Sequence, residues 1–128
     1  MNILGKLFTA IFVVMIVLTS IISPQSKAVN DDQWNKIKAR GELRVGLSAD
    51  YAPMEFERTV NGQREYAGID IELAKKIAKD NGVKLKIVNM QFDSLLGALK
   101  TGKVDVIISG MTPTDERKKE VDFSNSYM

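Results

Sequence analysis

The chain has 128 residues and a formal net charge of +2, and it contains no cysteine and no histidine. A chain without these residues has no thiolate or imidazole metal site, no cysteine nucleophile and no Ser-His-Asp triad of its own. Both excess positive charges, Lys6 and Lys27, lie in the N-terminal segment, so the rest is balanced. We therefore expect one domain with no nucleic-acid partner, no metal and no cofactor.

Residues 1–28 have the form of an export signal. Lys6 supplies the positive start, residues 7–22 form an apolar run, and Ser26 and Ala28 are small residues where a signal peptidase cleaves. The run of about sixteen residues is short for a membrane-spanning helix, which favours a cleaved signal over an uncleaved anchor. Both alternatives place residues 29–128 in the periplasm or on the extracellular face of the cytoplasmic membrane.

The first half of the exported part has clear boundaries between its elements. A helix is predicted over 31–40, because acidic residues open it and a glycine follows it. A strand over 42–48 comes next and leads into an irregular loop over 49–53. Asn61-Gly62 is a strong two-residue turn signal, so segments 54–58 and 64–66 should form a hairpin.

The second half alternates helix and strand. The helix over 69–82 is the clearest prediction, because apolar residues 69, 73, 74, 77 and 78 share one face. A strand is predicted over 84–88, a helix over 91–102 capped by Asp93 or Ser94, and a buried strand over 104–108. This order predicts an α/β fold whose mainly parallel sheet has helices on both faces.

The last eight residues, 121–128, begin another extended segment that ends without a turn or a cap. We expect the chain to be truncated there.

The segment after the last predicted strand, Ser109 to Thr114, is rich in hydrogen-bond donors. In a parallel sheet ligands bind outside the carboxyl ends of the strands. Gly110 permits a close approach of the backbone, Thr112 adds a hydroxyl donor, and Arg117 can bind a carboxylate with two parallel bonds. The alternative is that Thr114 caps a short helix and that Arg117 pairs with an acidic neighbour, Glu116 or Glu120, in solvent.

A second loop with unusual chemistry, 48–53, follows the first strand. Ser48, Asp50 and Tyr51 would complement a zwitterion that has an apolar or cationic part. The two loops would be neighbours if the first and last parallel strands pair. The alternatives are an ordinary loop in which Asp50 makes a local turn bond, and a Phe92 that belongs to the core rather than to a ligand wall.

Three stretches together resemble the first lobe of the bacterial extracellular solute-binding proteins of the polar amino-acid uptake type, family 3. They are GELRVGLSADYAPMEF, YAGIDIELAKKIAKDNG and FDSLLGALKTGKVDVIISGMTPTDERKKEVDFSNSY, and the resemblance extends over essentially all of residues 34–127. The resemblance implies a periplasmic-binding-protein-like (Venus-flytrap) fold in which two lobes close on an amino acid. It also implies that residues 29–128 are an incomplete first lobe and that the second lobe is missing.

The resemblance assigns roles to individual residues. It implies that Arg117 and the loop of Ser109, Gly110, Met111 and Thr112 hold the ligand carboxylate, while Tyr51 and Phe92 sandwich the side chain. The family position of Ser48 is often acidic, so side-chain specificity depends on Ser48 and Asp50. The ligand is expected to be a polar or basic amino acid, and a lobe without its partner lobe is expected to bind it weakly.

The implied function is that of the receptor of an ABC importer, with the membrane permease as its partner and no catalytic residues. Two alternatives remain on the same scaffold. One is a periplasmic dehydratase or transglycosylase-related enzyme, and the other is a ligand-sensing module fused to a permease or kinase.

Overall fold

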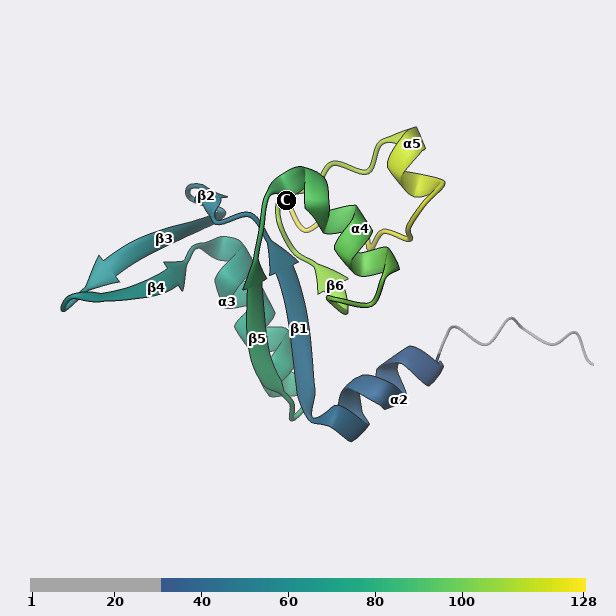
Figure 1. Cartoon of the computed structure of the whole chain (residues 1–128), viewed down its shortest axis with the longest axis horizontal. Helices are drawn as coiled ribbons and strands as arrows, with labels where there is room; N and C mark the ends of the chain where they lie inside the picture. The colour runs from purple at the N-terminus through teal and green to yellow at the C-terminus, as the bar shows by residue number, and fades with distance from the viewer. Residues whose placement is uncertain (1–30) are drawn as a thin grey trace, which may run out of the picture. The chain divides into compact units, whose positions relative to one another are not determined.

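The computed structural model describes residues 31–128, and the predicted export signal lies outside them. The predicted helices and strands follow one another in the predicted order, and β2 is an additional strand (Figure 1). The elements are α2 (Asp31–Arg40), β1 (Glu42–Leu47), β2 (Asp50–Tyr51), β3 (Glu55–Val60), β4 (Gln63–Ala67), α3 (Ile69–Asp80), β5 (Lys84–Asn89), η1 (Phe92–Ser94), α4 (Leu95–Lys100), β6 (Val106–Ile107) and α5 (Asp115–Lys118). Within this range no helix is long and apolar enough to cross a membrane.

The central sheet is parallel and has the strand order β5-β1-β6. The first and last predicted strands are therefore neighbours. The predicted strand over 104–108 is too long, because only Val106 and Ile107 pair with β1. The N–H of Val104 instead donates to the carbonyl of Ala98 at the end of α4, so this residue still belongs to the turn after the helix.

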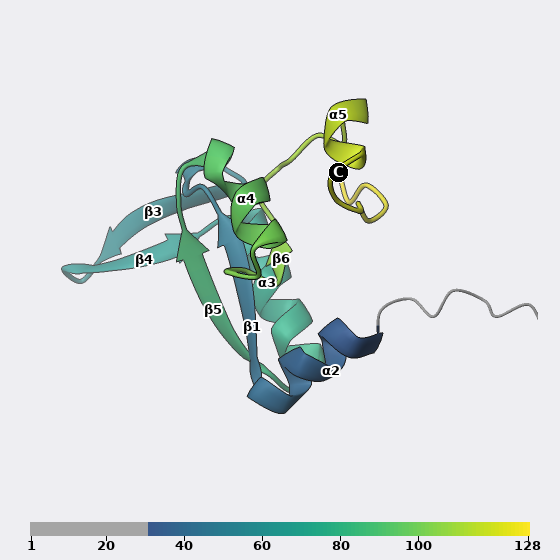
Figure 2. The ribbon, with the colours of Figure 1, turned by 45° about the vertical axis from the view of Figure 1, so that its right-hand side comes forward.

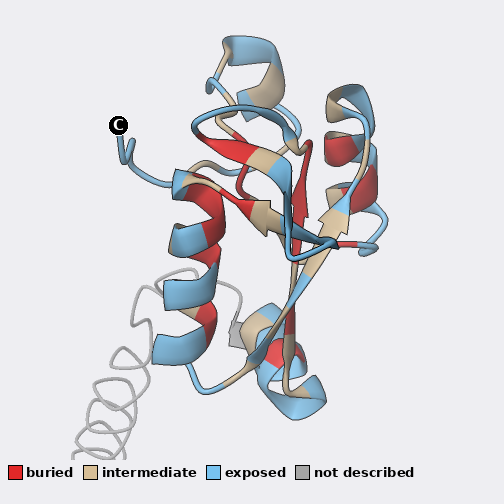
Figure 3. Cartoon of the chain, turned by 90° about the vertical axis from the view of Figure 1, so that its left-hand side faces the viewer, coloured by how far each residue is buried: buried red, intermediate tan, exposed pale blue. Residues whose placement is uncertain are grey.

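Helices cover both faces of this sheet, with α3 behind it and α4 in front in both views (Figures 1 and 2). On one face α2 and α3 pack against β1 in a core of buried residues, namely Ile37, Leu43, Val45, Ala74, Ala78 and Ile108. On the other face α4 approaches closely, since a Cβ on Gly46 would lie 3.3 Å from Leu95. The helices bury the sides that meet the sheet and expose the opposite sides (Figure 3).

The predicted hairpin is present as β3 and β4. Asn61 and Gly62 both have positive φ, 51° and 78°, as a tight hairpin turn of the type I′ requires. The sequence missed β2, whose two residues pair with the start of β3 and make a second sheet in the order β2-β3-β4. This pairing carries Tyr51 alongside Glu55.

The first turn of α3 departs from the predicted pattern. Ile69 was expected on the buried face and is 53% exposed, whereas Asp70 and Ile71 are buried. The reason is that the helix start packs on the chain before β3. The N–H of Ile69 donates to the carbonyl of Pro53, and that of Asp70 donates to the carbonyl of Met54. This contact satisfies donors that a helix terminus leaves open and turns Asp70 inward.

The predicted helix over 91–102 is divided into η1 and α4. Neither proposed cap is confirmed, because no side chain makes a capping hydrogen bond at the start of either part.

Gly68 gives a test of the contact between α3 and the chain before β3. Its φ is 123°, and a Cβ there would lie 2.2 Å from the carbonyl oxygen of Met54. We expect Gly68→Ala to lower the free energy of unfolding by about 3 kcal/mol or more, measured by urea denaturation. Gly97→Ala is the matched control, because a Cβ at Gly97 meets no atom within 4 Å and α4 gains a better helix former. Equal stability of the two variants would contradict this packing.

Candidate functional site

The loops that follow β1 and β6 meet at the carboxyl end of the sheet. The N–H of Ser48 donates to the hydroxyl oxygen of Ser109 over 3.1 Å. Further out, a Cβ on Gly110 would lie 3.5 Å from the ring of Tyr51. The structure therefore brings together Ser48, Tyr51, Ser109 and Gly110, which the sequence placed in one site.

Two donors of the second loop are used inside the protein. The Ser109 hydroxyl donates to Glu55 Oε1 over 2.6 Å, and the N–H of Gly110 donates to Asp70 Oδ2 over 2.9 Å. Both were expected to face a ligand carboxylate, and in this structure they do not. The physical reason is that Glu55 and Asp70 are 1% and 0% exposed, and buried carboxyl oxygens need hydrogen-bond donors.

Sequence reasoning gave no role in the site to Asp70 or to Glu55. A signal for Asp70 does exist, because positions 70, 74 and 78 follow one another at helical spacing and Ala74 and Ala78 are core residues. Glu55 has no such signal. Its burial depends on a long-range contact, because the start of β3 lies against the loop after β6, where Glu55 bonds to Ser109.

The environment of Glu55 disfavours its charged form. Burial raises the pKa of Glu55 to about 7, and the neighbouring Asp70 raises it as well, while the hydrogen bond from Ser109 acts in the opposite direction. Its second oxygen, Oε2, has no hydrogen-bond partner among the described residues. Glu55 is thus a carboxyl group that titrates near neutral pH beneath the candidate site.

Thr112 of the second loop is exposed and lies next to Arg117. The Arg117 guanidinium donates from Nη1 to the carbonyl oxygen of Thr112 over 2.9 Å, and it lies 5.3 Å from the centre of the Phe92 ring. The side chain of Thr114 caps α5 by accepting the N–H of Arg117. Two contacts therefore hold the guanidinium in place, and it retains further N–H donors for an anion.

The simpler alternative for Arg117 was an ion pair with Glu116 or Glu120. Among residues 31–128 neither pair forms, and Glu120 instead bonds to Lys100 over 3.1 Å. The cap by Thr114, the other half of that alternative, is present together with the contact to Phe92.

The first loop has one exposed aromatic and one exposed acid. Tyr51 is 60% exposed, and Asp50 also lies on the surface. The Ser48 hydroxyl donates to Asp50 Oδ1 over 3.1 Å, so the two polar candidates of this loop bond to each other. Ser48 itself is buried, which leaves Asp50 as the negative charge that this loop presents.

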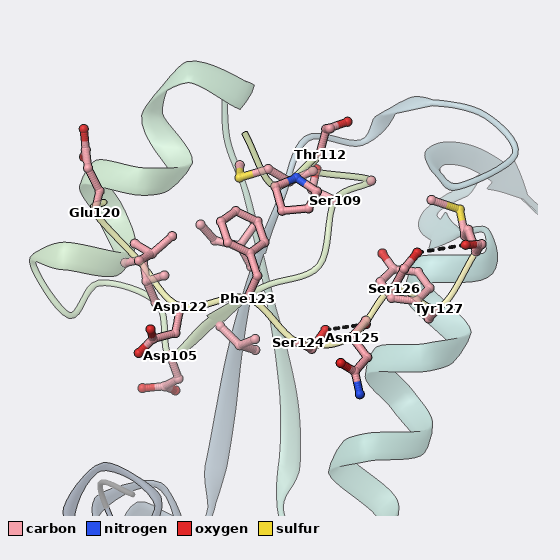
Figure 4. A pocket seen from close by; sticks show the side chains of 18 of the residues that line it. Asp105, Ser109, Thr112, Glu120, Asp122, Phe123, Ser124, Asn125, Ser126 and Tyr127 are labelled. Atoms are coloured by element: carbon pink, nitrogen blue, oxygen red, sulfur yellow. Dashed lines mark hydrogen bonds between the residues drawn. The ribbon is translucent and has the colours of Figure 1, made fainter. Parts of the chain in front are cut away.

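A cavity of about 720 Å³ lies beside the second loop (Figure 4). The loop from Ser109 to Pro113 and the C-terminal segment 120–128 line most of it, and Phe123 points from that segment toward the loop. Tyr51, Phe92 and Arg117 do not line this cavity. Thr112, which bonds to Arg117, does line it, so the cavity adjoins the group of residues around Arg117. Within residues 31–128, no cluster of three or more acidic, histidine or cysteine residues is arranged to hold a metal ion.

Comparison with known proteins identifies the family and the fold. Residues 43–128 match the sequence profile of the bacterial extracellular solute-binding proteins, family 3. Arginine-binding extracellular protein ArtP of Bacillus subtilis (strain 168) is 49% identical over 86 residues, which cover 67% of this chain and 32% of that protein. The chain belongs to this family, and it spans about a third of the length of that relative.

Two solved structures extend the comparison. The amino acid ABC transporter substrate-binding protein AbpA of Streptococcus pneumoniae, bound to L-arginine, has a TM-score of 0.72 and 46% identity, covering 73% of this chain and 40% of that chain. The arginine-bound form of domain 1 of TmArgBP, from T. maritima, has a TM-score of 0.67 and 58% identity, covering 72% of this chain and 71% of that chain. The periplasmic-binding-protein-like α/β fold is thereby established.

The raised pKa of Glu55 predicts how stability depends on pH. Unfolded, the carboxyl ionises near its ordinary value of 4.5, and folded near 7, so the native state binds the extra proton between these values. We expect Glu55 to make the free energy of unfolding fall by about 3 kcal/mol as pH rises across this window, and to contribute no further change above it.

The measurement is urea denaturation of the wild type and Glu55→Gln at several pH values from 4 to 8. The amide cannot ionise, so the difference between the two proteins should change with pH only in this window. A difference that stays constant with pH would show that Glu55 titrates normally.

Proposed function

We propose that this chain is the first lobe of an exported receptor of an ABC importer, and that it captures a cationic amino acid, arginine. One observation carries the proposal: the Arg117 guanidinium is held by Thr112 and Phe92 at the carboxyl end of the sheet, where a ligand carboxylate would bind. The arginine-binding relative and the arginine-bound structures support the choice of ligand. The receptor would act in the periplasm or at the cell surface, and its partner would be the membrane permease.

The proposed binding mode gives each exposed group one task. Arg117 and the outer donors of Met111 and Thr112 would bind the ligand carboxylate, because the donors of Ser109 and Gly110 are already engaged. A guanidinium and a carboxylate form parallel, charge-assisted bonds.

The ligand side chain would occupy the space between the two loops. Tyr51 and Phe92 offer aromatic faces for a planar cationic group. Asp50, which lies on the surface of the first loop, would supply the opposite charge.

The alternatives on the same scaffold have less support. The relatives compared above are named as binding proteins and not as enzymes. A sensing module fused to a permease or kinase would need sequence outside these 128 residues. No observation on the described residues favours this alternative. The proposal assigns residues 1–28 to the signal or anchor and residues 29–128 to the lobe.

Binding by the lobe alone is part of the proposal. The family pattern led us to expect weak binding without a second lobe, but the arginine-bound domain 1 of TmArgBP favours retention of the ligand by a single lobe. We expect isothermal titration of residues 29–128 to give tighter binding for arginine than for lysine, histidine, glutamine or cystine. The absence of binding to all of them at about 1 mM ligand, equivalent to about −4 kcal/mol, would contradict the proposal.

Substitution of Arg117 tests the binding mode. Arg117→Ala should weaken arginine binding by about 3 kcal/mol or more, because the desolvated ligand carboxylate loses its ionic partner. Arg117→Lys should recover only part of this loss, since an ammonium cannot form the parallel pair of bonds. Arg64→Ala is the matched control, because Arg64 is exposed on the hairpin. Unchanged affinity in both Arg117 variants would place the carboxylate elsewhere.

A further inference from the structure

Two carboxyl groups that bond to adjacent residues of the second loop, Ser109 and Gly110, lie in the interior without a basic partner. Glu55 comes from the start of β3 and Asp70 from the first turn of α3, and both are buried. Among residues 31–128, no lysine or arginine forms an ion pair with either of them. Two buried negative charges side by side would be costly in this setting, because neither solvent nor a cation offsets them.

The hydrogen bonds around the pair account for three of its four oxygens. Asp70 Oδ2 accepts the N–H of Gly110, and Asp70 Oδ1 accepts the hydroxyl of Tyr127 over 2.9 Å. Glu55 Oε1 accepts the hydroxyl of Ser109. The fourth oxygen, Glu55 Oε2, has no donor among the described residues.

Ionised carboxylates only accept hydrogen bonds, so two of them cannot bond to each other. A single proton on Glu55 Oε2, donated to Asp70, removes both the repulsion between two buried charges and the unsatisfied oxygen. It satisfies the fourth oxygen, and it leaves one negative charge instead of two. Both oxygens of Asp70 already accept hydrogen bonds, so the proton is placed on Glu55.

We propose that Glu55 and Asp70 share one proton and act as a positioning pair for the ligand loop, Glu55 through Ser109 and Asp70 through Gly110. This inference rests on the proposed function, because Ser109 and Gly110 begin the loop that continues into Thr112 and Arg117. Neither acid touches the ligand in this arrangement. The pair fixes the inner end of the loop, and the outer end then lies where the ligand carboxylate binds.

The charged surroundings decide what happens when the proton leaves. The titratable groups that face Glu55 are Asp50 on β2, Asp70 on α3 and Tyr127 in the C-terminal segment, and none of them is a cation. Burial and the nearby Asp70 raise the pKa of the Tyr127 hydroxyl, so this group stays a neutral donor. Loss of the proton therefore leaves two adjacent negative charges, and their repulsion acts on the bonds to Ser109 and Gly110.

The expected consequence is weaker ligand binding at alkaline pH. Burial raises the pKa of Glu55 to about 7, so the shared proton is present at pH 6 and mostly lost at pH 8. If only the protonated pair holds the loop in the binding geometry, arginine affinity falls about tenfold between these values. A carboxylate with an ordinary pKa would give no change in this range.

The experiment compares the wild type with two glutamine variants. Glu55→Gln mimics the protonated acid, because its amide can donate to Asp70 and still accept from Ser109. Glu57→Gln is the matched control, two residues further along β3 and exposed. The first measurement is the Gly110 amide signal in NMR spectra of the ligand-free proteins from pH 5.5 to 8.5, and the second is the arginine dissociation constant at pH 6 and pH 8.

We expect the Gly110 signal to titrate with a midpoint near 7 in the wild type and in Glu57→Gln, and not in Glu55→Gln. Arginine binding should weaken about tenfold from pH 6 to pH 8 in the first two proteins and stay nearly constant in the third. The inference is overturned if the Gly110 signal does not titrate, or if Glu55→Gln shows the same pH dependence as the wild type.

Two further outcomes are distinguishable. If no protein binds arginine at pH 6, the proposed function fails, and the Gly110 titration alone still decides whether the pair shares a proton. If Glu55→Gln does not fold, the ¹³C signal of the Glu55 carboxyl in the wild type decides. A midpoint near 7 supports the shared proton, and one near 4.5 overturns it.

Discussion

Two carboxyl groups buried beneath the end of β6 require hydrogen-bond donors, and the loop that follows the strand supplies them. Glu55 and Asp70 have almost no exposure, and the Ser109 hydroxyl and the Gly110 N–H bond to them. The rest of the candidate site depends on this requirement. The hairpin brings Glu55 under the loop, and the start of α3, which packs on the chain before β3 at Gly68, brings Asp70 to the same place.

The loop therefore has an inner and an outer side with different tasks. Its inner donors are engaged by the acids and fix the backbone. Its outer residues, Thr112 and the Arg117 that bonds to it, are held by the ring of Phe92 and the helix cap at Thr114. A loop fixed at both ends keeps its donors in place before the ligand arrives, which lowers the entropy that binding must offset. This arrangement suits a receptor, whose task is to recognise and release its ligand unchanged.

Local signals in the sequence were sufficient for most of the architecture. The turn at Asn61-Gly62 and the helix that begins at Ile69 depend on the conformations of a few neighbouring residues, and both were predicted. The exposure of Ile69, the pairing of β2 and the short length of β6 depend on packing between segments distant in the chain, and these were missed.

The same division holds for the candidate site. The sequence identified the two loops and Arg117, because small donors and a fixed cation stand out at strand ends. It could not show that Ser109 and Gly110 face inward, since this depends on acids 54 and 40 residues away along the chain. The resemblance to a binding-protein family gave the function class, and only the three-dimensional contacts showed that the donors of Ser109 and Gly110 bond to the two acids.

A crystal structure of the protein with arginine would test most directly whether Arg117 and Thr112 bind the ligand while Ser109 and Gly110 stay bonded to the two acids. We predict that the ligand carboxylate lies within hydrogen-bonding distance of the Arg117 guanidinium and of Thr112, with the Ser109 to Glu55 and Gly110 to Asp70 bonds unchanged. A ligand carboxylate that takes the Ser109 hydroxyl and the Gly110 N–H away from the two acids would contradict the account.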